Sequence, residues 1–169
     1  MLILCKPFKV SGGGSISSTD YMPTMTGPTN GPITVTESSV ETATYAGWHV
    51  FDDAYPGDAT RWLSLDGGPG CNEWVQIDFG SPVTLGAYQL RHTTYQGGPD
   101  DWTFEGSNDG SNWDVLDTQT GRGAEIYVGW VYATIASPAA YQYYRIFVTD
   151  TYIYTGYAGI DEMELFQIT

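Results

Sequence analysis

One short stretch of the chain combines several kinds of oxygen group that could bind a cation. Residues 48–62 hold three of them, Asp52, Asp53 and Asp58, together with the hydroxyl of Thr60 and several loop carbonyls. Hard oxygen ligands of this kind suit Ca²⁺ better than Zn²⁺. The stretch is therefore a candidate cation site, and the alternative is a metal-free loop in which the aspartates cap turns.

Catalytic chemistry has little support in the sequence. The histidines are His49 and His92, and there is no GxSxG, HExxH, Walker loop or CxxC pair. A glycosidase-like pair could exist among the 20 carboxylates, but no pattern selects one. Cys5 and Cys71 are too few for a disulfide framework and are expected to be unpaired thiols. We therefore expect a protein that is not an enzyme.

The charge of the chain excludes several classes of partner. Six Lys and Arg residues against 20 Asp and Glu residues give a net charge of -14 over 169 residues. Phosphate backbones and anionic membrane surfaces are bound by clustered cations, so nucleic acid and membrane-surface binding are disfavoured. The sequence shows no apolar run of transmembrane length, no signal peptide and no Asn-x-Ser/Thr sequon.

Strands are the elements expected to position these residues. Aromatic residues make up 15% of the chain and glycine numbers 21, a composition that favours strands and turns around a folded core. Alternating or apolar segments between turn signals predict strands at 74–79, 85–92, 102–105, 114–116, 143–148 and 163–166. Residues 1–30 differ, because residues 11–18 have the composition of a flexible linker. We therefore expect an N-terminal arm, residues 1–30, and one compact sandwich, residues 31–169.

Several motifs occur in an order that resembles a known family. An aromatic-Asp turn precedes Thr60-Arg61-Trp62, residues 74–83 read WVQIDFGSPV, residues 99–113 read PDDWTFEGSNDGSNW, and residues 160–166 read IDEMELF. Over residues 40–167 the chain resembles the discoidin domain, also called the coagulation-factor type C domain, and carbohydrate-binding module family 32. This resemblance implies an all-β fold, an antiparallel eight-stranded jelly-roll sandwich of the galactose-binding-like type, with ligand loops at one end.

The resemblance also implies a structural calcium ion. Members of the family often hold one where the first turn meets the last strand. The ligands implied here are the side chains of Asp52, Thr60 and Glu162, the carbonyls of His49 and Asp161, and a further oxygen from Asp58 or Asp53. The segment from Asp52 to Thr60 is longer than the compact turn usual in the family.

The resemblance places glycan contacts on three loops, residues 63–73, 92–101 and 150–159. Sugar sites combine aromatic faces with a few directional hydrogen-bonding groups. The candidates on and beside these loops are His92, Tyr95, Arg91, Asn72, Glu73, Tyr152, Tyr154 and Tyr157. Three of the tyrosines fall within residues 151–157, more than a short solvent loop needs, and the alternative is loop packing or contact with a protein.

Other motif residues are expected to serve the core. Trp102, Phe104 and Trp113 are predicted as core aromatics. Arg145 lies between apolar strand residues, and we expect it to pair with a buried carboxylate such as Asp78 rather than with ligand.

A second, weaker resemblance concerns the biological setting. Residues 21–51 look like the lead-in of discoidin modules in phage tail and fibre proteins. The expected function is therefore glycan adhesion without catalysis, in a virion or on an extracellular surface. The arm would contact other virion subunits or a second copy in a homo-oligomer. The alternative is a purely structural virion protein that uses the sandwich for protein contacts.

Overall fold

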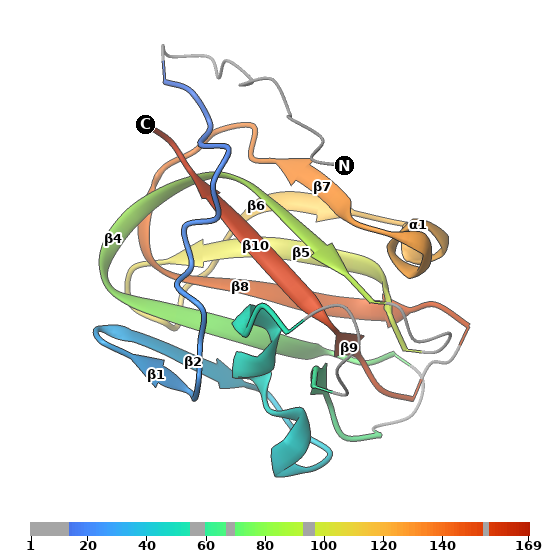
Figure 1. The fold of residues 1–169 in the computed structure, drawn as a ribbon. Coiled ribbons are helices and arrows are strands. Elements are labelled where there is room, and N and C mark those ends of the chain that lie inside the picture. Colours follow the sequence, from blue (N-terminus) through green and yellow to red (C-terminus); the bar gives the residue numbers. More distant parts are fainter. Residues whose placement is uncertain (1–13, 55–59, 67–69, 93–96, 154–155) are drawn as a thin grey trace.

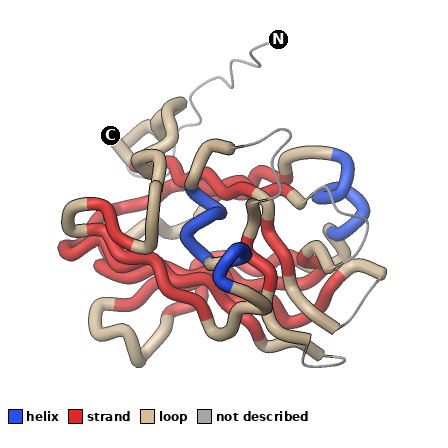
Figure 2. Tube along the Cα trace, turned by 60° about the horizontal axis from the view of Figure 1, so that its bottom comes forward, coloured by secondary structure: helices blue, strands red, loops and turns tan. Residues whose placement is uncertain are grey.

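Strands are the main regular elements of the computed structural model, which describes residues 14–54, 60–66, 70–92, 97–153 and 156–169. The strands are β1 (Thr29–Asn30), β2 (Ile33–Glu37), β3 (Trp62–Leu63), β4 (Glu73–Arg91), β5 (Pro99–Ser107), β6 (Asp114–Gln119), β7 (Val131–Thr134), β8 (Ala140–Thr151), β9 (Gly159–Ile160) and β10 (Glu162–Gln167). Two 3-10 helices, η1 (Ala43–Tyr45) and η2 (Gly47–Phe51), and the helix α1 (Gly123–Val128) lie outside the strands (Figure 2). In the described part of the chain, no helix has the length and apolar character needed to span a membrane.

The strands form two antiparallel layers that share β4 (Figure 1). The first layer has the order β1-β2-β4-β8-β5-β6, and the second has the order β10-β4-β7. The first half of β4 pairs with β2 and β8, and its second half pairs with β10 and β7. A separate ladder joins β3 to β9. The all-β antiparallel sandwich predicted from the sequence is confirmed.

Strand β4 corrects one prediction, because the two strands expected on either side of residues 80–82 are a single strand. The register against β8 shifts between Asp78 and Val83, and Gly80 has a φ of 72°, which glycine adopts without steric cost. An irregularity of this kind bends a strand and increases its twist. The local turn signal therefore marks the bend at which β4 passes from one layer to the other.

The core between the layers is rich in aromatic side chains. Trp102 and Phe104 are buried there as predicted, and the Phe104 ring stacks on Tyr88 with centroids 4.3 Å apart. Trp113 does not join them, because it is partly exposed and its ring centroid lies 4.1 Å from the guanidinium carbon of Arg145.

Arg145 does have a buried carboxylate partner, but the partner is Glu105 rather than Asp78. Its Nε lies 2.6 Å from Oε2 of Glu105, a residue that is 6% exposed. The register explains the choice, because Arg145 on β8 stands opposite Glu105 on β5, whereas Asp78 stands opposite Tyr143.

The described part of the predicted arm packs on the sandwich beside β10 (blue in Figure 1). The N–H groups of this segment donate to β10 and the residues after it, in the pairs Ser15 to Thr169, Ser17 to Gln167 and Tyr21 to Leu165. Ile16 is 6% exposed and Met25 is 1% exposed. A flexible arm is therefore a wrong description of residues 14–30, because their apolar side chains are part of the core. Residues 1–13 lie outside the described residues.

Candidate functional site

The acidic turn follows η2 directly. The N–H of Asp52 donates to the carbonyl of His49, and Oδ2 of Asp52 lies 2.7 Å from Nδ1 of the same histidine. Oδ1 of Asp52 accepts the N–H of Ala54 at 3.0 Å. Asp53 has a φ of 54° and accepts a hydrogen bond from the hydroxyl of Thr24. The turn is thus held in place both locally and by the N-terminal segment.

Glu162, the first residue of β10, lies beside this turn. It is 4% exposed, and among the described residues its buried Oε2 has no hydrogen-bond partner. Burial, reinforced by the charges of Asp52 and Asp53, raises the pKa of Glu162 to about 9. A buried carboxylate with an unsatisfied oxygen near two other carboxylates is neutralised either by protonation, which the raised pKa indicates, or by a cation. Oxygen ligands of this kind are the type that Ca²⁺ prefers, and the calcium ion stays a prediction.

The other predicted metal ligands are only partly placed together. Thr60 is described and partly buried, and Asp58 lies outside the described residues. The carboxylate of Asp161 faces His92 and Arg61, which leaves only its carbonyl for the predicted role. Within the described ranges, no group of three or more His, Cys, Asp and Glu residues is arranged to hold a metal ion. Any complete cage must therefore draw on hydroxyl and carbonyl oxygens or on undescribed residues.

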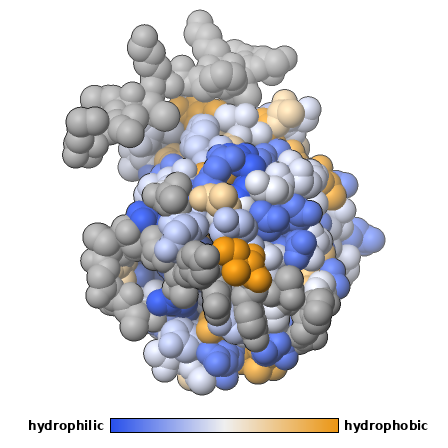
Figure 3. All heavy atoms as spheres, turned by 90° about the vertical axis from the view of Figure 1, so that its right-hand side faces the viewer, coloured by the Kyte–Doolittle hydropathy of each residue, from blue (hydrophilic) through white to orange (hydrophobic). Residues whose placement is uncertain are grey.

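The three predicted ligand loops meet at one end of the sandwich, which we call the loop end. Backbone hydrogen bonds join their described parts, in the pairs Ser64 to Ala158 at 2.9 Å, Tyr152 to Gly98 at 2.8 Å and Gly159 to Gly97 at 2.8 Å. Figure 3 faces this end and shows mostly hydrophilic described atoms around a small hydrophobic patch. The sequence therefore predicted correctly that these loops would be neighbours.

A charged cluster lies within the loop end. Oδ1 of Asp161 is 3.2 Å from Nδ1 of His92 and 3.6 Å from Nη1 of Arg61. His92 is 1% exposed, and this burial favours a role in positioning the loops over direct contact with ligand. Arg91 is 9% exposed, and its guanidinium carbon lies 5.3 Å from the ring centroid of Trp130.

The remaining predicted ligand residues differ in availability. Tyr152 and Tyr157 are partly exposed, and Tyr95 and Tyr154 lie outside the described residues. Between the described tyrosines, Ile153 is 51% exposed and has a φ of 65°.

Two polar candidates already have contacts inside the protein. Asn72 is exposed, and its Nδ2 donates to the carbonyl of Gly70 at 3.2 Å. The carboxylate of Glu73 accepts the hydroxyls of Ser38 and Ser39. As ligand contacts, both residues stay predictions.

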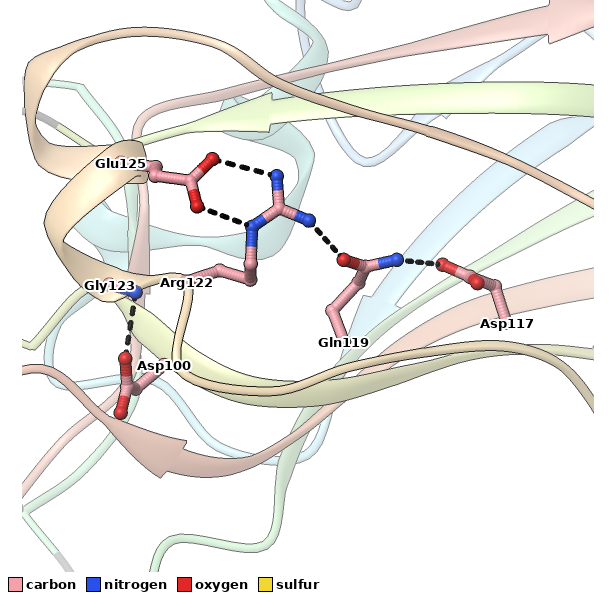
Figure 4. Close-up of polar contacts among 6 residues, drawn as sticks. All are labelled: Asp100, Asp117, Gln119, Arg122, Gly123 and Glu125. Carbon is pink, nitrogen blue, oxygen red and sulfur yellow. Dashed lines mark hydrogen bonds and ion pairs between the residues drawn. The ribbon is translucent and has the colours of Figure 1, made fainter.

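Helix α1 closes one side of the loop end. Its polar contacts, drawn in Figure 4, involve Asp100, Asp117, Gln119, Arg122, Gly123 and Glu125. Oδ1 of Asp100, on β5, accepts the N–H of Gly123 at 2.7 Å, and the carbonyl of Ile126 accepts the N–H of His92 at 3.3 Å. The helix is thus fixed to the sheet on one side and to the start of a ligand loop on the other.

Trp130 follows α1 and is a residue of this region that the sequence reasoning missed. The alternation Trp130-Val131-Tyr132-Ala133 was the available signal, because it places two large aromatics on one face of a strand.

Comparisons with known proteins agree with this architecture. The family model of the F5/8 type C domain matches residues 34–163. A mutant of chitosan-binding module 1, from a chitosanase/glucanase of Paenibacillus sp. IK-5, is 26% identical with a TM-score of 0.63, over 79% of this chain and 92% of that one. Chitosan-binding module 2 of the same enzyme, in complex with chitotriose, is 24% identical with a TM-score of 0.60, over 78% and 93%.

A third solved structure shares the fold at lower identity. The family 32 carbohydrate-binding module of NanJ from C. perfringens, in complex with galactose, is 14% identical with a TM-score of 0.65, over 81% of this chain and 95% of that one. No curated protein matches the chain. With more than half of its length covered by the family model, the chain belongs to the F5/8 type C, or discoidin, domain family.

Proposed function

We propose that this protein is a carbohydrate-binding module that holds its glycan at the loop end. The observation that carries the proposal is the meeting of three loops, one of which carries the partly exposed Tyr152 and Tyr157. Aromatic faces stack on the C–H faces of sugars, and a few fixed polar groups orient the hydroxyls. The chitosan-binding module that is 26% identical supports binding without catalysis.

Two glycan classes are the first to test. Chito-oligosaccharides come first, because a chain with a net charge of -14 complements a cationic polymer and because of the 26% identical module. Galactosides come second, since the galactose-bound module shares the fold.

Calorimetric titration of both glycan classes tests the proposal. Wild type is expected to bind at least one of them, and Tyr157→Ala is expected to weaken the affinity about tenfold, the effect of losing one aromatic contact. Tyr143→Ala is the matched control, because Tyr143 is a partly exposed tyrosine of β8 in the first layer. If neither class binds and the protein instead co-assembles stably with another subunit, the structural alternative is favoured.

We further propose that the acidic turn binds Ca²⁺ in a structural role. The unsatisfied Oε2 of Glu162 beside Asp52 supports this proposal. The residues that would hold the ion are Asp52, Thr60 and Glu162, with the carbonyls of His49 and Asp161 and with Asp58 outside the described residues. An ion that binds only the folded state at 100 times its dissociation constant stabilises that state by about 2.7 kcal/mol.

Thermal melts in Ca²⁺ and in chelator test this second proposal. Wild type and Glu164→Gln are expected to melt higher in Ca²⁺, and Glu162→Gln is expected to melt equally in both. Glu164 is the matched control because it lies two residues along the same strand, where it accepts a hydrogen bond from Gln89. A wild type that melts at the same temperature in both solutions would show that the turn holds no calcium.

The virion or surface location and the partners of the N-terminus also stay proposals. Residues 14–30 pack on β10, so a segment that reaches a partner would lie in residues 1–13, which contain both lysines of the chain. Deleting residues 1–13 is expected to abolish co-assembly or self-association in light scattering while leaving glycan affinity unchanged.

A further inference from the structure

The outer face of the second layer carries two exposed aromatic residues. Trp130 is 36% exposed and Tyr132 is 39% exposed. Tyr132 lies on β7, which among the described residues pairs only with β4 and is therefore an edge strand. Side chains two positions apart on a strand project from the same face, about 7 Å apart. Trp130 directly precedes β7, and we call Trp130 and Tyr132 the aromatic row.

Polar groups stand directly beside this row. The register places Gln89 opposite Tyr132, and Arg91, two residues further along β4, reaches Trp130 with its guanidinium carbon 5.3 Å from the ring centroid. Nε2 of Gln89 donates to Oε2 of Glu164 on β10 at 2.7 Å, and both side chains are partly exposed. Aromatic surface and amide, guanidinium and carboxylate groups therefore occur side by side on one face.

The row is continuous with the loop end. Arg91 directly precedes His92, and its carbonyl accepts the N–H of Asp161 at 3.0 Å. Trp130 follows α1, whose Ile126 carbonyl accepts the N–H of His92. Trp130 thus lies at the rim of the loop end, and Tyr132 lies further along β7 as the strand runs away from α1 (Figure 1).

We propose that the glycan site extends from the loop end over Trp130 and onto Tyr132, so that the ligand is a chain of several sugar units rather than a single terminal sugar. This inference rests on the proposed function. Trp130 and Tyr132 would stack on successive sugar rings. The Gln89 amide would donate hydrogen bonds to the sugar substituents or accept them, and the Glu164 carboxylate would accept them. Arg91 holds the indole of Trp130 through a cation–π contact and so acts as a positioning residue.

The chemistry of the face favours a glycan over a protein partner. Protein interfaces combine aromatic anchors with a desolvated core depleted in charged residues. Here the two exposed large hydrophobics are both aromatic. The ring of Tyr132 contacts Phe166, and the other neighbours across the strands are Gln89, Arg91 and Glu164. This mixture of planar rings and hydrogen-bonding groups is the one that sugar sites use.

The test is the dependence of affinity on ligand length. Calorimetry would use monosaccharide, trisaccharide and hexasaccharide members of the chito-oligosaccharide and galactoside series. Wild type is expected to bind the hexasaccharide at least about tenfold more tightly than the monosaccharide. Trp130→Ala and Tyr132→Ala are expected to remove most of this gain, whereas Tyr143→Ala keeps the gain and leaves the monosaccharide affinity unchanged.

Other outcomes separate the two levels of the proposal. If wild type binds the monosaccharide and the hexasaccharide equally, or if Trp130→Ala keeps the full gain, the extended site is wrong and the loop-end function stands. If wild type binds no member of either series, the proposed function itself fails. Trp130→Phe keeps an aromatic face and is expected to retain part of the gain, which excludes misfolding as the cause of the alanine result. A change of oligomeric state in Trp130→Ala with unchanged glycan affinities would instead assign the row to a protein interface.

Discussion

Replacing Gly86 with alanine tests whether the N-terminal segment is an integral part of the sandwich. A Cβ on Gly86 would lie 2.5 Å from Cδ1 of Ile168 and 2.9 Å from Cγ1 of Ile16, closer than the 3.0 Å below which such contacts essentially never occur. The two isoleucines must therefore move, or the segment must lift from β4. Overpacking of this kind costs about 1–3 kcal/mol, which corresponds to a fall of about 2–12 °C in Tm for a domain of this size.

A double variant identifies the cause of that loss. Ile16→Ala removes a side chain that is 6% exposed, and we expect it to cost about 2 kcal/mol, near the lower end of the range for truncated core residues because the site borders the surface. In the combined variant, the contact of the new methyl with Ile16 is relieved, while its closer contact with Ile168 remains. The two losses are therefore expected to fall short of additivity by about 1 kcal/mol.

The assay is urea unfolding followed by tryptophan fluorescence, with amide exchange at Ser15 and Ser17 as a local readout. Gly27→Ala is the matched control, because a Cβ there meets nothing within 4 Å in the same N-terminal segment. The packing of residues 14–22 would be refuted if Gly86→Ala were as mild as Gly27→Ala, or if the two losses in the double variant simply added.

Two further variants test buried charges. Burial raises the pKa of Asp20 from 3.8 to about 6, so the stability that its neutral form contributes is complete below pH 3.8 and is lost as the pH rises through 6. Asp20→Asn keeps the Oδ1 acceptor for the N–H groups of Met22 and Leu165. Its unfolding free energy should therefore decline less steeply than that of wild type between pH 4 and pH 6, and equal slopes would contradict this. Glu105→Gln leaves the Arg145 guanidinium without its carboxylate and should cost about 3 kcal/mol at neutral pH in thermal denaturation, whereas a loss below about 1 kcal/mol would mean that the ring of Trp113 satisfies the charge alone.

The fold class and the meeting of the predicted ligand loops followed from the family resemblance that the ordered motifs carry. Strand pattern and motif order can be read directly from the sequence. The side-chain partners across the sheet were harder to predict from the sequence. Arg145 was expected to find a carboxylate and did, but the choice of Glu105 over Asp78 depends on strand register, which is set by residues far apart in sequence.

Predictions from local sequence signals were wrong where tertiary contacts overrode those signals. Residues 80–82 have turn chemistry, yet β8 pairs with β4 on both sides of them, and β10 pairs with β4 after them. The Gly/Ser-rich composition of residues 11–18 indicated a free linker, but Ile16 lies within it and finds a buried place made by Gly86. Of the candidate site, Glu162 was assigned from its motif alone, and only its burial and unsatisfied oxygen give that assignment a physical reason.

The sharing of β4 by both layers has a consequence for how this chain folds. Strand β2 near the start of the described chain and β10 near its end both pair with β4, so the ladders on that strand close only when distant parts of the chain have come together. Contacts of such long sequence separation slow folding. During synthesis the second layer cannot be completed until residues 162–167 have emerged. Until then, the second half of β4 has one unpaired edge. Rapid refolding of this protein would therefore depend on how soon β10 reaches β4.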